Sequence, residues 1–247
     1  MSALRPPSLT HYKTHASLLA TIPHFCDKTK TMTESYQPRG PQRFEAALRR
    51  FDEENARDPN VEQVAGVAHP RELIYAQWLT EWVLKLSPEA SEPLRLAARC
   101  QHLCRWLVPR DSYPMTRAGY LKWREGLKHF HAQKAGDILR EVGYPEDVIA
   151  RVQSLNLKKD LPQDAEMQVL EDALCLVFLE HQFGDLAGKT TDDKMIGVLQ
   201  KTWKKMTPAA HALALTLSYD SHGRALIEKA LKPADEVGRA SNNPGSA

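Results

Sequence analysis

Apolar side chains recur at helical spacing along most of this 247-residue sequence, and no segment alternates apolar and polar residues as a strand would. Phe44, Leu48 and Phe51 follow one another at such spacing, which predicts a first helix from about 42 to 57. Further helices are expected at about 70–86, 91–107, 117–142, 146–155 and 164–183, with two or three more in 192–231. The sequence therefore predicts an all-α protein, with one domain of roughly eight or nine helices over residues 42–231.

The two ends of the chain have the composition of tails. Residues 1–41 hold five prolines and many Ser and Thr residues, and no acid precedes Asp27. The ending SNNPGSA gives residues 232–247 the same character. We expect both tails to be disordered. An acid-poor start is also a feature of mitochondrial transit peptides, so we expect a cytoplasmic protein, with a mitochondrial location as the alternative.

Charge is balanced over the chain as a whole but not along it. Lys and Arg number 33 against 31 Asp and Glu, a formal net charge of +2, so the chain is not a general polyanion binder. Between Arg95 and Lys134, however, nine basic residues stand against two acids, which suits phosphate groups. The longest apolar run, Ala173–Leu179, is too short to cross a bilayer, and no membrane partner is expected.

Four polar residues lie on helix faces where apolar residues are expected: Glu72, His102, His131 and Asp172. Each belongs to a different expected helix. Burying even a neutral polar group without a partner costs about 2–7 kcal/mol, so four such residues suggest a shared site. Two imidazoles and two carboxylates suit a divalent ion such as zinc, manganese, iron or magnesium. We therefore expect these four residues to hold a divalent metal ion.

Each of the four also has a structural explanation. Glu72 lies in the first turn of its helix, where an acid complements the helix dipole. A buried His131 bonded to a backbone carbonyl would need no metal. His102 lies at the edge of its helix face. Asp172 is too deep in its helix to be a cap, so it needs a cation or several donors, and the neighbouring Glu171 is expected to be more exposed.

The basic segment supplies a pool of candidate phosphate-binding side chains. These are Arg99, Arg105, Arg110, Arg117, Arg124 and Lys128. Tyr113, Trp106 and Trp123 are interleaved with them and could stack on a base. The structural alternative carries equal weight: the aromatic residues would clamp the loop 108–116 onto the helices, with the arginines in ion pairs.

Several segments resemble a known family over residues 42–231. They are RELIYAQWLTEWV, LAARCQHLCRW, PRDSYPMTRAGYLKWREGLKHFHAQKAGDILREVGYP and QVLEDALCLVFLEHQF. Together they resemble a family of uncharacterised fungal and bacterial proteins that are often labelled glutamyl-tRNA synthetase-like. The chain contains neither a HIGH-like nor a KMSKS-like motif.

More remotely, the order of elements resembles the HD phosphohydrolase superfamily, which is all-α and binds metal through a His, a His-Asp dyad and a later Asp. Gln101-His102 stands where the dyad would be, and Glu72 or His69 near the first His. The resemblance implies a metal-dependent phosphohydrolase with His131 and Asp172 as catalytic residues, acting on a nucleotide or other small phosphorylated metabolite. The alternatives are a non-catalytic nucleotide- or RNA-binding module, nucleic acid being the less expected partner, and a metal-dependent small-molecule enzyme of other chemistry.

Overall fold

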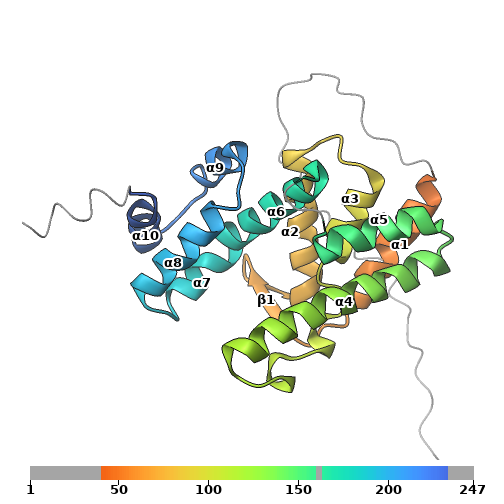
Figure 1. Ribbon diagram of the computed structural model, residues 1–247, viewed down its shortest axis with the longest axis horizontal. Coiled ribbons are helices and arrows are strands. Elements are labelled where there is room, and N and C mark those ends of the chain that lie inside the picture. The colour runs from red at the N-terminus through yellow and green to blue at the C-terminus, as the bar shows by residue number, and fades with distance from the viewer. Residues whose placement is uncertain (1–39, 160–162, 233–247) are drawn as a thin grey trace, which may run out of the picture. The chain divides into compact units, whose positions relative to one another are not determined.

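The computed structural model describes residues 40–159 and 163–232, and almost all of both expected tails lies outside these ranges. Ten α-helices occur in the described residues, which confirms the all-α class and exceeds the expected number of helices (Figure 1). They are α1 (Pro41–Asn55), α2 (Arg71–Leu86), α3 (Glu92–Cys100), α4 (Arg117–Glu141), α5 (Glu146–Leu157), α6 (Ala165–Val177), α7 (Phe183–Ala187), α8 (Asp192–Trp203), α9 (Pro208–Ala214) and α10 (Ser221–Leu231).

Helix ends follow local sequence chemistry. Asp164 caps α6 by accepting hydrogen bonds from the backbone N–H groups of Glu166 and Met167, as expected. Gly143 follows α4 at a positive φ of 83°, and the next N–H, from Tyr144, bonds back to the carbonyl of Leu139. Because these signals are local, most expected helix boundaries agree with the structure within two residues.

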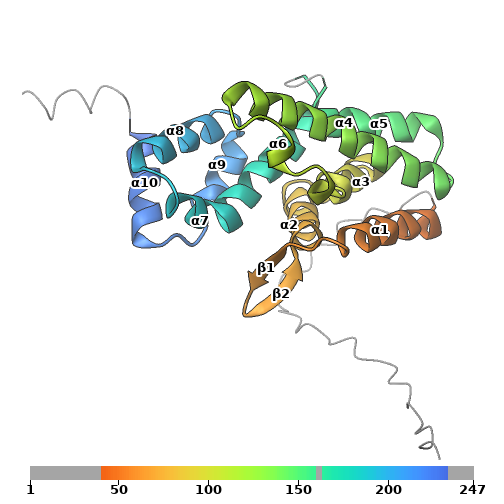
Figure 2. The same ribbon diagram turned by 90° about the horizontal axis from the view of Figure 1, so that it is seen from below.

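A β-hairpin precedes α2, and the expectation of no strands is wrong at this point. Strands β1 (Val61–Val64) and β2 (Val67–Pro70) pair antiparallel (Figure 2). They are joined by Ala65 and Gly66, whose φ angles of 49° and 80° are those of a tight hairpin turn. Four-residue strands are too short to show a periodic pattern, so the turn was the only signal in the sequence.

The expected helix 91–107 ends early, at Cys100. A turn follows, and Cys104 adopts a left-handed φ of 55° before the 3-10 turn η1 (Arg105–Leu107). The backbone N–H of Cys104 is bonded to Oδ1 of Asn55, from the end of α1, at 3.1 Å. His102 therefore lies on a turn rather than on a helix edge. A second 3-10 turn, η2 (Arg110–Ser112), lies in the loop before α4.

The helix expected at 164–183 is interrupted. It changes at Phe178 into a π-helix, η3 (Phe178–Gln182), before α7 continues it. A π turn holds one residue more than an α turn needs, and such turns often occur at functional sites.

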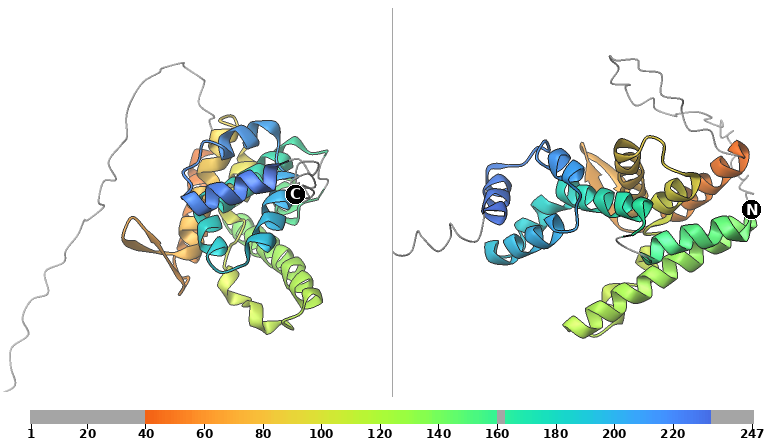
Figure 3. Two further views of the ribbon diagram at one scale, coloured as in Figure 1. Left: turned by 90° about the vertical axis from the view of Figure 1, so that its left-hand side faces the viewer. Right: turned by 45° about the horizontal axis from the view of Figure 1, so that its top comes forward.

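The helices pack around one hydrophobic core. Helix α2 contacts both α3 and α6, and α4 and α5 form an antiparallel pair (Figures 1 and 3). Phe51, Leu79, Leu96 and Leu176 are fully buried members of this core. Near the other end of the described chain, α8 packs against α10. None of the described helices combines the length and apolar character that a membrane crossing requires.

Candidate functional site

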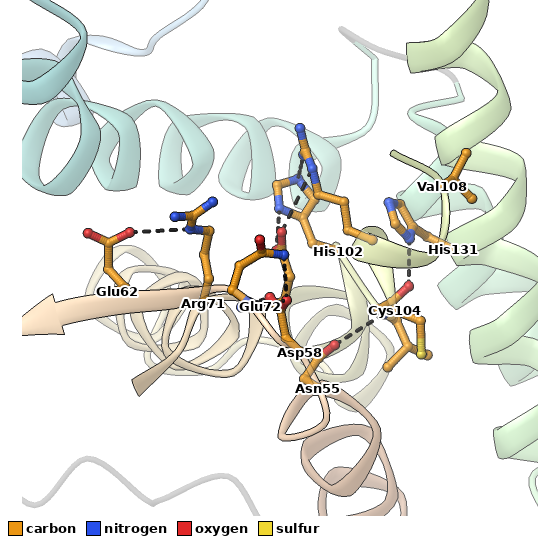
Figure 4. Close-up of polar contacts among 12 residues, drawn as sticks. Asn55, Asp58, Glu62, Arg71, Glu72, His102, Cys104, Val108 and His131 are labelled. Atoms are coloured by element: carbon orange, nitrogen blue, oxygen red, sulfur yellow. Dashed lines mark hydrogen bonds and ion pairs between the residues drawn. The ribbon is translucent and has the colours of Figure 1, made fainter. Parts of the chain in front are cut away.

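A cavity of about 390 Å³ opens among α2, the turn after α3, α4, α6 and α8. Two of the four expected metal ligands, His102 and His131, line it. Glu72 does not line the cavity but contacts His102, so three of the four residues lie together (Figure 4). Asp172 does not line this cavity.

Glu72 is buried at the start of α2. Its backbone N–H donates to Oδ2 of Asp58 at 3.0 Å, so that a distant carboxylate caps this helix. The Glu72 side chain lies 3.3 Å from Nδ1 of His102 and 3.8 Å from the guanidinium of Arg105. Burial raises the pKa of Glu72 to about 7, although Arg105 opposes the shift.

His102 is held by contacts to both ring nitrogens. Nη1 of Arg105 lies 3.3 Å from Nε2, and a guanidinium can only donate, so Nε2 accepts. Nδ1 then carries the proton and points at Glu72. The ring stacks on Tyr75 with centroids 4.2 Å apart. Burial, and then the charge of Arg105, lowers the pKa of His102, so this imidazole is neutral.

His131 is buried in the middle of α4, as expected from the helix face. Its Nδ1 lies 2.8 Å from the backbone carbonyl of Leu103, which can only accept, so Nδ1 carries the proton. The structural explanation offered for His131 is therefore present. Nε2 is left as a buried acceptor with no hydrogen-bond partner in the described chain. Burial, and then proximity to His102, lowers the pKa of His131 to about 3.

Asp172 forms structural hydrogen bonds away from the cavity. Oδ1 accepts from the backbone N–H of Thr207 at 3.0 Å and from Gln168, and Oδ2 accepts from the Thr207 hydroxyl at 2.5 Å. Thr207 is the N-cap of α9. Several donors thus satisfy this buried carboxylate, and they tie α6 to the start of α9.

Glu171, the neighbour of Asp172, faces the cavity instead. Both acids are buried, at 5 % and 3 % exposed, so exposure does not separate them. Glu171 pairs with Lys158 and, at 3.1 Å, with Lys205. These two lysines hold the pKa of Glu171 below its usual value against the effect of burial. Lys158 follows α5 at a left-handed φ of 57°.

The cavity wall is strongly basic. Five cationic side chains line it against one carboxylate, Glu171; they are Arg105, Arg124, Lys128, Lys158 and Lys205. Three of these, Arg105, Arg124 and Lys128, belong to the phosphate-binding pool expected from the sequence. Lys158, Lys205 and Glu171 were not foreseen: Glu171 lies on α6, which is buried on nearly all sides, and the two lysines lie just after the ends of α5 and α8, where helical periodicity gives no facing.

The rest of the expected pool lies elsewhere. Arg99 forms two bonds of 2.6 Å to the carboxylate of Asp52. Arg110 donates to the carbonyls of Tyr113, Pro114 and Thr116 and so holds the loop before α4. Arg117 and Tyr113 do not line the cavity. Arg99 therefore forms the ion pair that the structural alternative expected, whereas Arg110 holds the loop through backbone carbonyls and not through an ion pair.

Aromatic rings complete the wall. Trp123 and Tyr120 come from α4, Tyr75 from α2 and Phe178 from the π-helix. The guanidinium of Arg105 lies 5.1 Å from the centroid of the Trp123 ring, within cation–π range. Trp106, the other expected stacking residue, packs against the hydrophobic core.

As the side chains stand, the expected donors do not form a metal-binding group. Both nitrogens of His102 are engaged, and the Asp172 carboxylate is bonded to Thr207. The described part of the chain holds no group of three or more His, Cys, Asp or Glu side chains arranged for a metal ion. Arg105 also places a cation beside the two imidazoles. A divalent ion at this cavity stays a prediction without a prepared set of ligands.

Fold and site together define an all-α protein with a basic, aromatic-lined cavity that is also lined by two neutral histidines. The chain belongs to the family described as "Domain of unknown function (DUF4202)", whose model matches residues 45–227. This confirms that the chain is a member of an uncharacterised family. Comparisons with curated proteins and with solved structures found no match.

Proposed function

We propose that the cavity binds a small phosphorylated metabolite. The observation that carries this proposal is the excess of cations on the wall, five against the single carboxylate of Glu171. Because the whole chain has a net charge of only +2, this excess is a local property of the site. Cationic side chains in a partly enclosed wall attract phosphate more strongly than the same charges on an open surface.

The aromatic side chains favour a ligand with a planar or ring-shaped part. Trp123 is buried with its indole nitrogen bonded to the carbonyl of Val108 at 2.9 Å, so the orientation of its ring is fixed. A fixed aromatic face beside cationic groups is a common arrangement for nucleotides and related metabolites. The volume of about 390 Å³ suits a ligand of that size.

Hydrolysis of the bound phosphate ester is the second candidate. The observation in its favour is the pKa of Glu72, about 7, which suits general acid–base catalysis near neutral pH. Glu72 contacts His102, whose ring lines the cavity, so the Glu72 carboxyl lies one side chain away from a bound ligand. The test is phosphate release from AMP by the full chain, with and without Mg²⁺, Mn²⁺ or Zn²⁺, compared with Glu72→Gln.

Binding is tested by calorimetry on the full chain with AMP, inorganic phosphate and adenosine. We expect AMP and phosphate to bind and adenosine to bind much more weakly. Arg124→Gln should weaken AMP binding about tenfold, the usual effect of losing one charge-assisted hydrogen bond. Arg124 is the suitable position because it lines the cavity yet is exposed on α4, so that the fold should tolerate the change.

Lys122→Gln is the matched control, since Lys122 is an exposed cation on the same helix outside the cavity wall. Equal affinity of the two variants, or no binding of any phosphorylated compound, would contradict the proposal. Single-stranded RNA, the less expected partner, is tested in parallel; RNA binding unaffected by Arg124→Gln and by AMP would place that activity elsewhere.

A further inference from the structure

Two hydrogen-bond acceptors in the cavity wall have no partner among the residues that the structure describes. They are Nε2 of His131 and Oε1 of Gln101. Both side chains line the cavity, and both are more than nine-tenths buried, at 3 % and 6 % exposed. Buried polar atoms in proteins are nearly always hydrogen-bonded, so two free acceptors on one wall call for an explanation.

The acceptor character of His131 follows from its neighbours. The carbonyl of Leu103 fixes the ring proton on Nδ1, and Nε2 is therefore left with a lone pair. The neighbouring His102 cannot donate to it, because the proton of that ring points at Glu72. Nε2 of His131 thus needs a donor from outside the wall.

The charged groups of the wall form another class. Lys158 and Lys205 pair with Glu171, and Arg105 with Glu72 and His102. These groups are donors and cations, which suit phosphate oxygens. The cavity therefore offers cations for an anion and, separately, two neutral acceptors for O–H or N–H groups.

We infer that the ligand is a hydroxylated phosphate ester, such as a sugar phosphate or a ribonucleotide, whose hydroxyl groups donate to Nε2 of His131 and Oε1 of Gln101. This inference rests on the proposed function and names its ligand class. A phosphate ester without hydroxyl groups would satisfy the cations but leave both acceptors without partners. Such a mismatch is a strong basis for discrimination, because the site's own buried groups then go unpaired.

The experiment compares two esters of similar length and equal phosphate charge, ribose 5-phosphate and n-pentyl phosphate, by calorimetry on the full chain. We expect ribose 5-phosphate to bind at least about tenfold more tightly, the effect of one or two hydrogen bonds between neutral groups. Equal affinities would overturn the inference, attribute the two acceptors to ordered water, and leave the proposed function standing. Binding of neither ester, together with no binding of AMP, would overturn both.

Two substitutions at His131 separate its two nitrogens. In His131→Asn the amide nitrogen can keep the bond to Leu103, but no group replaces Nε2. In His131→Gln an amide oxygen can replace Nε2, but the bond to Leu103 is lost. We expect the Asn variant to lose much of the preference for ribose 5-phosphate and the Gln variant to retain more of it. The reverse order would assign His131 a purely structural role.

Gln101→Leu gives a second measurement that does not depend on His131. It should weaken the binding of ribose 5-phosphate more than that of n-pentyl phosphate, and so reduce the preference for the sugar phosphate. An unchanged preference in both Gln101→Leu and His131→Asn would overturn the inference. If the variants do not fold, the comparison of the two esters on the unmodified chain decides the question alone.

Discussion

Glu72 and His131 share one environment, and burial shifts their pKa values in opposite directions. Burial disfavours a charged group, so it raises the pKa of the Glu72 carboxyl to about 7 and lowers that of the His131 imidazole to about 3. Both groups are therefore biased toward their neutral forms. The opposite shifts also act oppositely on stability, since one favours low pH and the other high pH.

Substitution of Glu72 by Gln isolates one of these effects. A raised pKa means that the protonated carboxyl contributes stability fully below its usual pKa of 4.5, and that this stability is lost as pH rises to about 7. The amide of the variant cannot ionise and still accepts from His102, so the variant keeps its stability. Between pH 5 and pH 8 the wild type should lose about 2.5 kcal/mol of unfolding free energy relative to Glu72→Gln. Urea unfolding at both pH values measures this, and parallel pH profiles would contradict it.

Asp172 provides a second prediction at the level of a single residue. Its carboxylate accepts three hydrogen bonds, two of them from Thr207 at the start of α9. Asp172→Ala should therefore lower the free energy of unfolding by about 2–3 kcal/mol. Affinity for AMP should not change, because Asp172 does not line the cavity. A stable Asp172→Ala variant that no longer binds AMP would contradict this account and would support the site role that the sequence predicted for Asp172.

The candidate site was only partly predictable from single residues. Helical periodicity correctly marked His131 and Asp172 as core-facing, and two arginines of the basic segment, Arg105 and Arg124, line the cavity. Periodicity could not tell which of two adjacent buried acids faces a cavity, because α6 is buried on nearly all sides. That choice depends on which helices pack on each face, and Lys158 and Lys205 reach the site only through this packing.

At the level of elements, local signals predicted the helices well and the connections poorly. Helix α4 begins and ends where Thr116 and Gly143 indicate, because caps act over a few residues. The early end of α3 depends instead on Asn55, which bonds to Cys104 from a distance in sequence. The π-helix likewise has no local marker. Long-range contacts of this kind leave no periodic trace in the sequence.

The start of α4 gives a testable prediction at this scale. A Cβ atom at Gly119 would lie 2.0 Å from the carbonyl oxygen of Pro114, which Arg110 also holds. Gly119→Ala should therefore destabilise the protein by about 1–3 kcal/mol, since the backbone must move. Gly197→Ala in α8 is the matched control, where a Cβ would meet nothing within 4 Å. It should stabilise the helix by roughly 0.5–1 kcal/mol. Equal melting temperatures for the two variants would contradict this account of the loop.

At the level of the whole molecule, the cavity joins parts of the chain that are distant in sequence. Its wall runs from Tyr75 on α2 to Lys205 just after α8. A ligand held there should stabilise the protein against global unfolding, by about 2.7 kcal/mol at a hundredfold excess over Kd. The near-neutral charge of the chain gives no hint of this, because the basic wall is offset by acids elsewhere.

Salt should therefore weaken AMP binding even though the chain carries little net charge. Raising NaCl from about 50 to about 300 mM should raise the Kd for AMP several-fold, because screening shortens the Debye length to well under about 10 Å. The dependence of the Kd on salt concentration should be weaker for Arg124→Gln and unchanged for Lys122→Gln. Calorimetry at several salt concentrations measures this dependence. An affinity independent of salt would point to recognition through the aromatic wall alone.

The π-helix at Phe178–Gln182 controls the rotational orientation of the helices that follow it, beginning with α7. Each residue of an α-helix turns the chain by about 100°, so one extra residue in a regular helix would rotate everything after it by that angle. The π turn takes up one extra residue by widening, so that Phe183 stays packed on Tyr219 with the ring centroids 5.8 Å apart. By absorbing this residue, the π turn preserves the orientation of α7 and of α10, which packs on both α7 and α8.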